Sequence, residues 1–295
     1  MLVDIGANLT HQSFQKDLEE VLKKQPTLKT ALFYMTQSRL ELGQLDQARA
    51  FIGDLERYHP NYQRLGLLKI QAAFIANQPQ SALQEANLLI RKVSKGYAGD
   101  AANRQELEEL RVRGITARGL ASLQLGRMED AEKDLSEVAK LSPNSAGAKI
   151  NLARLYSSKR DFDQALEYYE SALASDARNF DALTGVVSTL TAKKEFDGAR
   201  AKIDKAMQAL GEDKKTLPAM HYLKSDVYSA EKNYDSAESE LKKAIELDEE
   251  YLQAYSAYAS LLFAKNKTDE ALAQYRKVIE KKPSASVYTL IGMIE

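Results

Sequence analysis

Residues 146–179 read AGAKINLARLYSSKRDFDQALEYYESALASDARN, and this stretch decides the fold. In its second half, Ala165 is followed by a hydrophobic residue four positions on and by another seven positions on. That spacing puts three apolar side chains on one face of a helix. A side chain as short as alanine lets a neighbouring helix approach closely. The stretch therefore predicts a hairpin of two packed helices.

One alanine with this spacing lies in each of seven segments of the chain: Ala48, Ala82, Ala131, Ala165, Ala199, Ala237 and Ala271. Successive alanines are 34, 49, 34, 34, 38 and 34 residues apart, so a 34-residue register with two insertions accounts for residues 29–285. The seven units are 29–62, 63–96, 112–145, 146–179, 180–213, 218–251 and 252–285. We expect each alanine to be buried between the two helices of its unit.

An acidic residue stands two positions before the alanine in six of the seven units. The six are Asp46, Glu129, Asp163, Asp197, Asp235 and Asp269. A carboxylate at that place is expected to cap the free amides of the second helix and to complement the helix dipole.

A 34-residue unit with alanine at its twentieth position resembles the tetratricopeptide repeat. Three units end in proline, as the pattern of that family favours, whereas its tryptophan at position 4 is absent from all seven units. The resemblance implies an all-α fold, a right-handed superhelical solenoid of antiparallel helix pairs with about seven full repeats and a half repeat at each end. It also implies a non-catalytic scaffold of the kind found in bacteria, whose partner is a protein or a peptide.

The composition supports the all-α prediction, since the chain of 295 residues has only 6 prolines and 14 glycines. Its 41 basic and 42 acidic side chains nearly cancel, and neither sign collects in a long block. That balance argues against nucleic acid and against an anionic membrane as partners. No apolar run approaches the roughly 20 residues that a membrane helix needs, so direct membrane insertion is not expected.

Neither the cysteine content nor the N-terminus decides the localisation. The chain has no cysteine, and it therefore suits a reducing and an oxidising compartment equally well. Residues 1–10 lack the basic and apolar regions of a signal peptide. The sequence as it stands indicates a cytoplasmic protein, and a periplasmic one if a leader had been removed from it.

The segments outside the seven units complete the predicted domain organisation. Residues 1–10 are an N-terminal extension, 11–28 a partial repeat, 29–96 two units, 97–111 a helical insertion, 112–285 five units, and 286–295 the start of a further, truncated repeat. The insertion is expected to lengthen the helix that follows it, with Asp100 as N-cap. The last segment is largely apolar, which suggests a piece of a longer protein or an end covered by a second copy.

No catalytic constellation can be assembled from the sequence. The histidines His11, His59 and His221 lie far apart in a stack whose units contact only their neighbours. The spacings of zinc hydrolases, of the phosphate-binding loop and of the nucleophile elbow are all missing. We therefore expect no catalytic, cofactor-binding or metal-binding residues, and no cofactor.

The opening residues MLVDIGANLTH, 1–11, and the chain up to about Asp17 resemble the first strand and loop of the TatD-type metal-dependent hydrolases. Those enzymes are (β/α) barrels whose metal ligands come from many strand ends. No alternation of strands and helices follows residue 20, and Asp4, Asn8 and His11 lack every downstream ligand. A TatD-like hydrolase is therefore only a remote alternative, and a fusion remnant, a mispredicted start or coincidence is preferred.

In tetratricopeptide arrays the first helix of each unit lines a concave face, and the resemblance implies which residues point into it. The early units contribute a mostly apolar set: Phe33, Tyr34, Gln37, Leu67, Leu68, Gln71 and Phe74. The later units contribute a polar set: Asn151, Arg154, Tyr222 and Asp226. Tighter packing could instead bury the apolar set, and the polar set could simply face solvent.

Two hypotheses about function follow. The first is a scaffold that binds a protein or peptide partner in this concave groove. The second is an assembly module that forms a homo-oligomer through its uncapped ends, above all the C-terminal half repeat.

Overall fold

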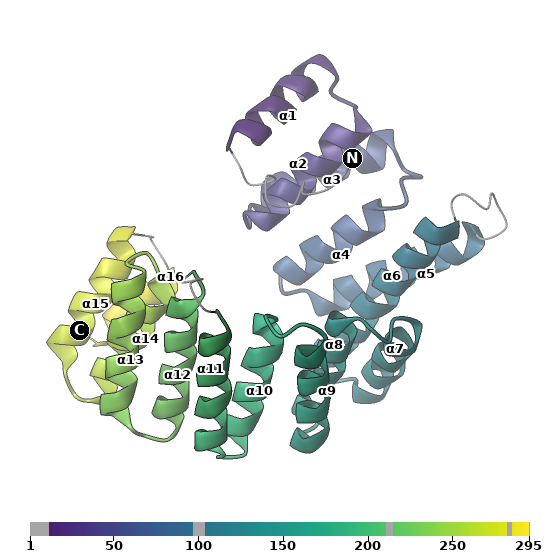
Figure 1. Ribbon diagram of the computed structural model, residues 1–295. Helices are drawn as coiled ribbons and strands as arrows, with labels where there is room; N and C mark the ends of the chain where they lie inside the picture. Colours follow the sequence, from purple (N-terminus) through teal and green to yellow (C-terminus); the bar gives the residue numbers. More distant parts are fainter. Residues whose placement is uncertain (1–11, 97–103, 211–214, 282–284, 295) are drawn as a thin grey trace. The chain divides into compact units, whose positions relative to one another are not determined.

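The computed structural model describes residues 12–96, 104–210, 215–281 and 285–294 (Figure 1). Within these residues the chain forms sixteen helices and no strand, which confirms the all-α prediction. Contacts divide the chain into two compact units, Met1–Pro143 and Asn144–Glu295, which we name the N-terminal unit and the C-terminal unit. Each unit is a stack of antiparallel helix pairs.

The N-terminal unit contains seven helices within the described residues. They are α1 (Gln12–Lys24), α2 (Lys29–Glu41), α3 (Leu45–Tyr58), α4 (Leu65–Ile75), α5 (Pro79–Gly96), α6 (Arg104–Gln124) and α7 (Met128–Leu141). The hairpins are α2–α3, α4–α5 and α6–α7, and α1 packs against α2. Leu18 of α1 is buried beside Ala31 and Met35 of α2.

The residues before the third hairpin extend its first helix. α6 is one helix of 21 residues, and its early side chains Leu107 and Leu110 are each 3% exposed. They pack in one cluster with Leu89 and Val93 of α5. The added turns therefore belong to the hydrophobic core, while the expected cap Asp100 lies outside the described residues.

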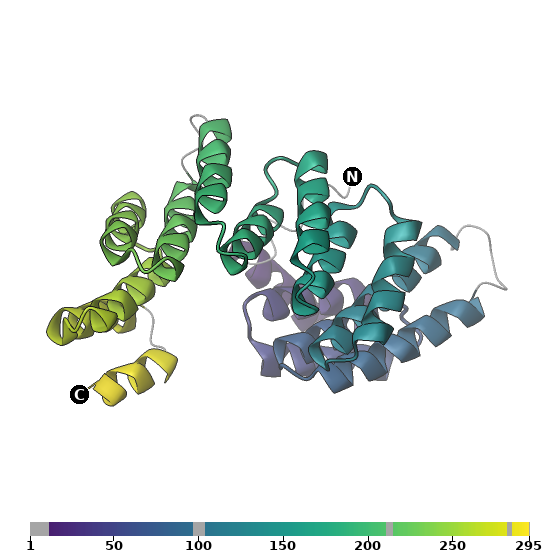
Figure 2. The same cartoon turned by 90° about the horizontal axis from the view of Figure 1, so that it is seen from below.

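The C-terminal unit contains nine helices within the described residues. They are α8 (Ala146–Ser158), α9 (Phe162–Ser175), α10 (Phe180–Ala192), α11 (Phe196–Leu210), α12 (Leu217–Ala230), α13 (Tyr234–Leu247), α14 (Leu252–Ala264), α15 (Thr268–Lys281) and α16 (Ala285–Ile294). Figure 2 shows the successive hairpins α8–α9, α10–α11, α12–α13 and α14–α15 from below. The first helices α8, α10, α12 and α14 lie closer to one another than the second helices do, so this stack curves toward its first helices. We name those four helices the inner layer.

The seven alanines of the register have no exposed surface at all. Their burial between the paired helices is confirmed, and it explains why the spacing around them is strict. A larger side chain at these positions would force the two backbones apart.

Every hairpin turns through a residue in the left-handed conformation at position 15 of its 34-residue unit. These residues are Gly43, Asn77, Gly126, Arg160, Lys194, Lys232 and Asn266, with φ between 53° and 72°. The next amide donates to the carbonyl five residues earlier, as the amide of Asp161 does to the carbonyl of Tyr156 at 2.9 Å. The same bond closes the first helix in all seven hairpins.

The acidic residues two positions before each alanine do not cap the second helices. They lie inside the first turn, and in α3, α7, α9 and α13 the cap is the residue that directly follows the left-handed turn. Asp161 and Asn233 are such caps and accept from the amides of Gln164 and Ser236 at 3.2 and 3.3 Å. The expected capping role is therefore wrong, because the turn leaves only one residue before the helix starts. The carboxylates still lie where the helix dipole favours negative charge.

Candidate partner-binding site

The structure packs two residues of the predicted apolar set into the core of the N-terminal unit. Phe33 is 9% exposed and Leu68 is 2% exposed. The ring of Phe33 meets those of Tyr34 and Tyr62 edge-on, at centroid distances of 5.4 and 5.7 Å. A partner can therefore reach little of Phe33 or Leu68, because neighbouring helices close over them, and these two do not line an open groove as expected.

The remaining residues of the apolar set offer little open apolar surface. Tyr34, Gln37, Leu67 and Phe74 are half-buried, and Gln71 is exposed. Leu67 and Phe74 lie against the cluster that joins α4, α5 and α6. Packing between helices thus accounts for most of this set.

A pocket that the sequence did not predict lies at the α3–α4 turn of the N-terminal unit. It has a volume of about 620 Å³ and is lined by Lys29, Tyr58, His59, Pro60, Asn61, Tyr62, Gln63, Arg64 and Glu106. Arg64 Nε donates to Glu106 Oε1 at 2.9 Å, and Lys29 Nζ lies 5.4 Å from the ring centre of Tyr62. The repeat pattern does not specify this loop, and these charged groups already have partners within the unit.

The predicted polar set lies on the inner layer of the C-terminal unit. Asn151 and Arg154 come from α8, and Tyr222 and Asp226 come from α12, with α10 between these two helices. Asn151 and Tyr222 are half-buried, whereas Arg154 and Asp226 are exposed. The α8 pair therefore belongs to a different part of this layer from the α12 pair.

A pocket of about 310 Å³ lies between α8, α9 and α10. Its lining residues are Arg154, Ser157, Phe162, Tyr169, Asp181, Thr184, Gly185, Ser188, Thr189 and Ala192. Arg154 Nη2 lies 3.7 Å from Asp181 Oδ2, and both side chains are well exposed. An exposed ion pair at that distance contributes little to stability, so both groups can turn toward a ligand.

Gly185 makes room for the aromatic wall of this pocket. A Cβ atom at Gly185 would lie 2.2 Å from Cε1 and 2.4 Å from Cδ1 of Tyr169, so the tyrosine ring lies against the bare backbone of α10. Tyr169 is 6% exposed, and burial is the main cause that raises the pKa of its phenol. The repeat spacing puts Tyr169 on the apolar face of its helix but does not identify the glycine against which its ring packs.

Asp226 stands beside two tyrosine rings on the inner layer. Tyr222 lies one helical turn before it on α12, and the ring of Tyr222 meets the ring of Tyr251 edge-on at 5.8 Å. Tyr251 directly precedes α14. Burial, followed by the charge of Asp226, raises the pKa of Tyr222, and the same charge also contributes to the raised pKa of Tyr251.

The carboxylate of Asp226 has no hydrogen bond or ion pair with any residue that the structure describes. It is accessible to water, but the protein around it removes enough hydration to raise its pKa to about 6. Asp181 on α10 is different, because Arg154 lies beside it. Sequence reasoning selected Asp226 by its position but could not predict that no cation accompanies it.

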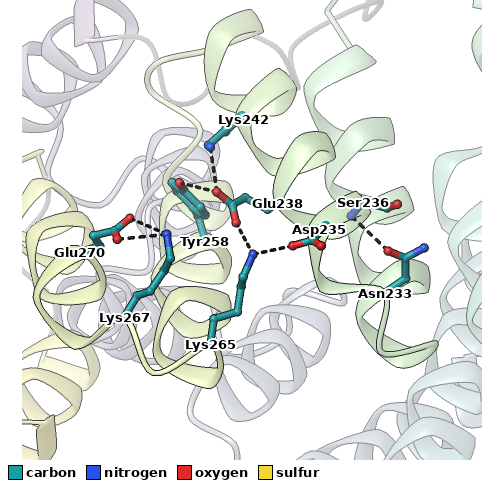
Figure 3. A network of polar contacts seen from close by, with 9 residues as sticks. All are labelled: Asn233, Asp235, Ser236, Glu238, Lys242, Tyr258, Lys265, Lys267 and Glu270. Carbon is teal, nitrogen blue, oxygen red and sulfur yellow. Dashed lines mark hydrogen bonds and ion pairs between the residues drawn. The ribbon is translucent and has the colours of Figure 1, made fainter.

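A second polar cluster fixes α13 to the end of α14. Glu238 accepts from Lys242 Nζ at 2.8 Å and from Lys265 Nζ at 2.7 Å, and Lys265 also donates to Asp235 at 2.8 Å (Figure 3). The hydrogen bonds from Lys242 and Lys265 lower the pKa of Glu238 to about 2. These four charged groups pair with one another, so this cluster stabilises the hairpin stack.

His221 also has a structural partner. Its Nδ1 lies 2.6 Å from Glu240 Oε2, and Glu240 is only 7% exposed. Burial alone would raise the pKa of Glu240, but hydrogen bonds from His221 and Lys243 outweigh it and lower that pKa. The imidazole thus joins α12 to α13.

The described part of the chain shows neither a cluster of metal-ligating side chains nor an apolar helix long enough for a membrane. There, no three histidine, cysteine, aspartate or glutamate side chains gather as a metal site would require. None of the helices that the structure describes has the length and apolar character to cross a membrane. The TatD-like residues Asp4, Asn8 and His11 lie outside the described residues.

Comparison with known proteins finds the same family in four parts of the chain. Four family models, each described as tetratricopeptide repeat, match residues 30–62, 112–145, 150–213 and 228–294. A crystal structure of a tetratricopeptide repeat protein from Parabacteroides merdae superposes with a TM-score of 0.60 at 14% identity, over 90% of this chain and 98% of that one. At this identity the similarity supports the fold alone.

Two curated bacterial proteins are related in sequence. Type IV pilus assembly protein PilF of Pseudomonas aeruginosa is 28% identical over 193 residues, which cover 58% of this chain and 75% of that protein. Cellulose synthase operon protein C of Pseudomonas fluorescens is 26% identical over 135 residues, or 46% of this chain, but the match spans only 10% of that much longer protein. The four family-model matches, together with the hairpin repeated seven times, establish that the chain belongs to the tetratricopeptide repeat family of protein-interaction scaffolds.

Proposed function

We propose that this protein is a non-catalytic scaffold that holds a peptide segment of a partner protein on the inner layer of its C-terminal unit. The observation that carries the proposal is the pocket of about 310 Å³ between α8, α9 and α10. Its volume is at the lower end of the ~300–1,000 Å³ range of ligand pockets and suits one large side chain. The aromatic residues Phe162 and Tyr169 supply an apolar wall for that side chain.

Polar groups around the pocket complement an extended backbone. Arg154 and Asp181 carry opposite charges at exposed positions, and the exposed Ser188 adds a hydroxyl group. A peptide backbone has donors and acceptors in alternation, so a rim with both kinds of group can pair with it. We therefore favour an extended segment over a folded domain as the bound form.

A peptide-display selection on the full chain, followed by fluorescence anisotropy of a selected peptide, tests this function. Ser188→Arg places a bulky charged side chain at the pocket and is expected to weaken binding at least tenfold. Ala201→Arg, at an exposed position of α11 in the outer helices, is the matched control and is expected to leave affinity unchanged. Equal affinities of all three proteins would move the binding site away from the inner layer.

The exposed face of α16 supports a second candidate function, self-association. Tyr288, Leu290 and Met293 are 54%, 39% and 77% exposed on this one helix. Neighbouring apolar side chains that remain open to water are typical of interaction surfaces. The relative from Pseudomonas aeruginosa is named a pilus assembly protein, and a role in an assembly suits a chain that pairs with its own copies.

Light scattering across a wide range of concentration tests self-association. The apparent molecular mass is expected to rise with concentration from that of the monomer toward that of the dimer. The double variant Tyr288→Lys, Met293→Lys is expected to stay monomeric. Leu88→Lys, at a residue of α5 that is also 54% exposed, is the control for removal of an unrelated apolar side chain. A monomer mass at the highest concentration reached would rule this candidate out.

A further inference from the structure

The carboxylates of the inner layer differ in whether a cation accompanies them. Within the described residues of α8, α10, α12 and α14, these carboxylates are Asp181 and Asp226. Arg154 lies 3.7 Å from Asp181. Arg154 is residue 9 of its repeat and Asp181 is residue 2 of the next repeat, so this contact joins two neighbouring repeats.

The same two positions in the repeats 218–251 and 252–285 do not form an ion pair. Asp226 is residue 9 of its repeat, and residue 2 of the next repeat is the uncharged Gln253. No described residue donates a hydrogen bond to Asp226 or forms an ion pair with it. The two basic residues on the same helix have other partners, Lys224 with Asp204 at 2.7 Å and His221 with Glu240 at 2.6 Å. The negative charge is therefore held on the inner layer without compensation.

The neighbours of Asp226 add a second feature that favours a cation. The rings of Tyr222 and Tyr251 meet edge-on at 5.8 Å. The negative charge of Asp226 contributes to the raised pKa of both phenols. The faces of tyrosine rings attract ammonium and guanidinium groups, and this attraction grows where water is partly excluded. Elsewhere in the chain the tyrosines already receive cations, as Tyr228 receives the Arg200 guanidinium 4.9 Å from its ring centre.

We infer that Asp226, with Tyr222 and Tyr251, forms a recognition site for one lysine or arginine side chain of the partner segment. This inference rests on the proposed function and specifies the chemistry of the ligand. An incoming cation restores to the carboxylate the electrostatic stabilisation that it lost with part of its hydration. A partner with an acidic group at this point would instead meet repulsion.

Display selection with a random peptide library separates this inference from the proposed function. The full chain is used as wild type, as Asp226→Asn and as Asp269→Asn, the last being an exposed aspartate of α15 that serves as charge control. Peptides selected on the wild type are expected to share a lysine or arginine at one position, at least fivefold above the library. That preference should vanish on Asp226→Asn and persist on Asp269→Asn.

A selected peptide then allows a double-mutant cycle by fluorescence anisotropy. Replacing its shared basic residue by norleucine, or Asp226 by Asn, is expected to weaken binding about tenfold in each case, and the two changes together no more than either alone. Replacement of the residue by the other cation, lysine for arginine or the reverse, shows which of the two the site prefers. Circular dichroism of Asp226→Asn confirms that its helices are retained.

Each remaining outcome has one meaning. Peptides that bind without a shared basic residue, or with one that Asp226→Asn does not affect, overturn the inference and leave the proposed function standing. A library that yields no peptide for the wild type overturns both.

Discussion

At the scale of single residues, the pocket between α8, α9 and α10 depends on the absence of a side chain at Gly185. Tyr169 lies so close to Gly185 that any side chain there must displace the ring or the helix. Gly185→Ala is therefore expected to lower the free energy of unfolding of the C-terminal unit by about 1–3 kcal/mol, the usual cost of overpacking. Urea unfolding, with hydrogen exchange of α9 and α10, measures the change.

Gly198 in α11 provides the opposite expectation for the same substitution. A Cβ atom there would meet Leu190 at 3.9 Å, which is an ordinary contact. Gly198→Ala should raise the free energy of unfolding by up to about 1 kcal/mol, because alanine favours a helix. Equal effects of Gly185→Ala and Gly198→Ala would contradict the packing of Tyr169 on α10.

The affinity for a basic peptide is expected to depend on pH through Asp226. The pKa of free Asp226 is raised to about 6 by loss of hydration, and a bound cation favours the ionised form. Affinity for a peptide with a basic residue should therefore be at its maximum well above pH 6 and fall as pH drops through 6, by about fivefold between pH 7.5 and 5. Anisotropy with a histidine-free peptide measures this profile, and Asp226→Asn should flatten it.

The residues around Asp226 support the attribution of this pH dependence to Asp226. The titratable groups that act on this cluster are Tyr222 of α12, Tyr251 before α14, and Asp248 after α13, and loss of hydration alone shifts Asp226. Burial raises the pKa of both phenols above their ordinary value near 10, so neither tyrosine titrates in the tested range. An unchanged pH profile in Asp226→Asn would show that another group controls the affinity.

At the scale of elements, the turn inside each hairpin carries conformational strain that a substitution can relieve. Lys194 has a φ of 63° and is exposed, so Lys194→Gly removes the steric penalty of the left-handed conformation without the loss of a packed side chain. We expect an increase of about 0.5–1 kcal/mol in the free energy of unfolding. Lys205→Gly, within α11, should instead decrease it by about 1 kcal/mol. A decrease for both variants in urea unfolding would contradict the turn geometry.

The ion-pair cluster around Glu238 stabilises the contact between α13 and α14. Because hydrogen bonds from Lys242 and Lys265 lower the pKa of Glu238 to about 2, its contribution is complete above the ordinary glutamate pKa and is lost as pH falls toward 2. After allowance for solvent screening, Glu238→Gln should cost about 1–2 kcal/mol at pH 7 and much less at pH 2.5. Thermal unfolding at several pH values measures this difference.

Glu246 on the same helix is the control for that prediction. It is exposed and has no ion pair with a described residue, so Glu246→Gln should change stability by less than about 0.5 kcal/mol at either pH. A loss as large as that of Glu238→Gln would assign the effect to the overall charge of the chain rather than to the cluster.

Local sequence pattern was sufficient to predict the helices and their core but not their turns. The buried alanines follow from a strict 34-residue spacing, since close approach of two helices tolerates no larger side chain there. The left-handed turn was missed because five of its seven residues are not glycine, and tertiary packing imposes the conformation on them. The caps were misplaced by two residues for the same reason.

At the scale of the whole molecule, the candidate site could be predicted only in part. Position in the repeat selected both Phe33 and Asp226 as inner-face residues, yet the former is in the core and the latter is accessible. Burial of Phe33 depends on Tyr34 and Tyr62, which pack around it. Asp226 has no ion pair because no neighbouring side chain of the described residues offers it a cation. Neither property is set by the residue itself or by its place in the repeat.

Backbone amide shifts of the full chain show whether the first helices of the C-terminal unit bind a peptide, as proposed. A display-selected peptide is titrated into the isotope-labelled protein at pH 7.5. The proposed site predicts that the largest shift changes lie in α8, α10 and α12, at Arg154, Gly185 and Asp226 among others. Changes confined to α9, α11 and α13, or to the N-terminal unit, would contradict it.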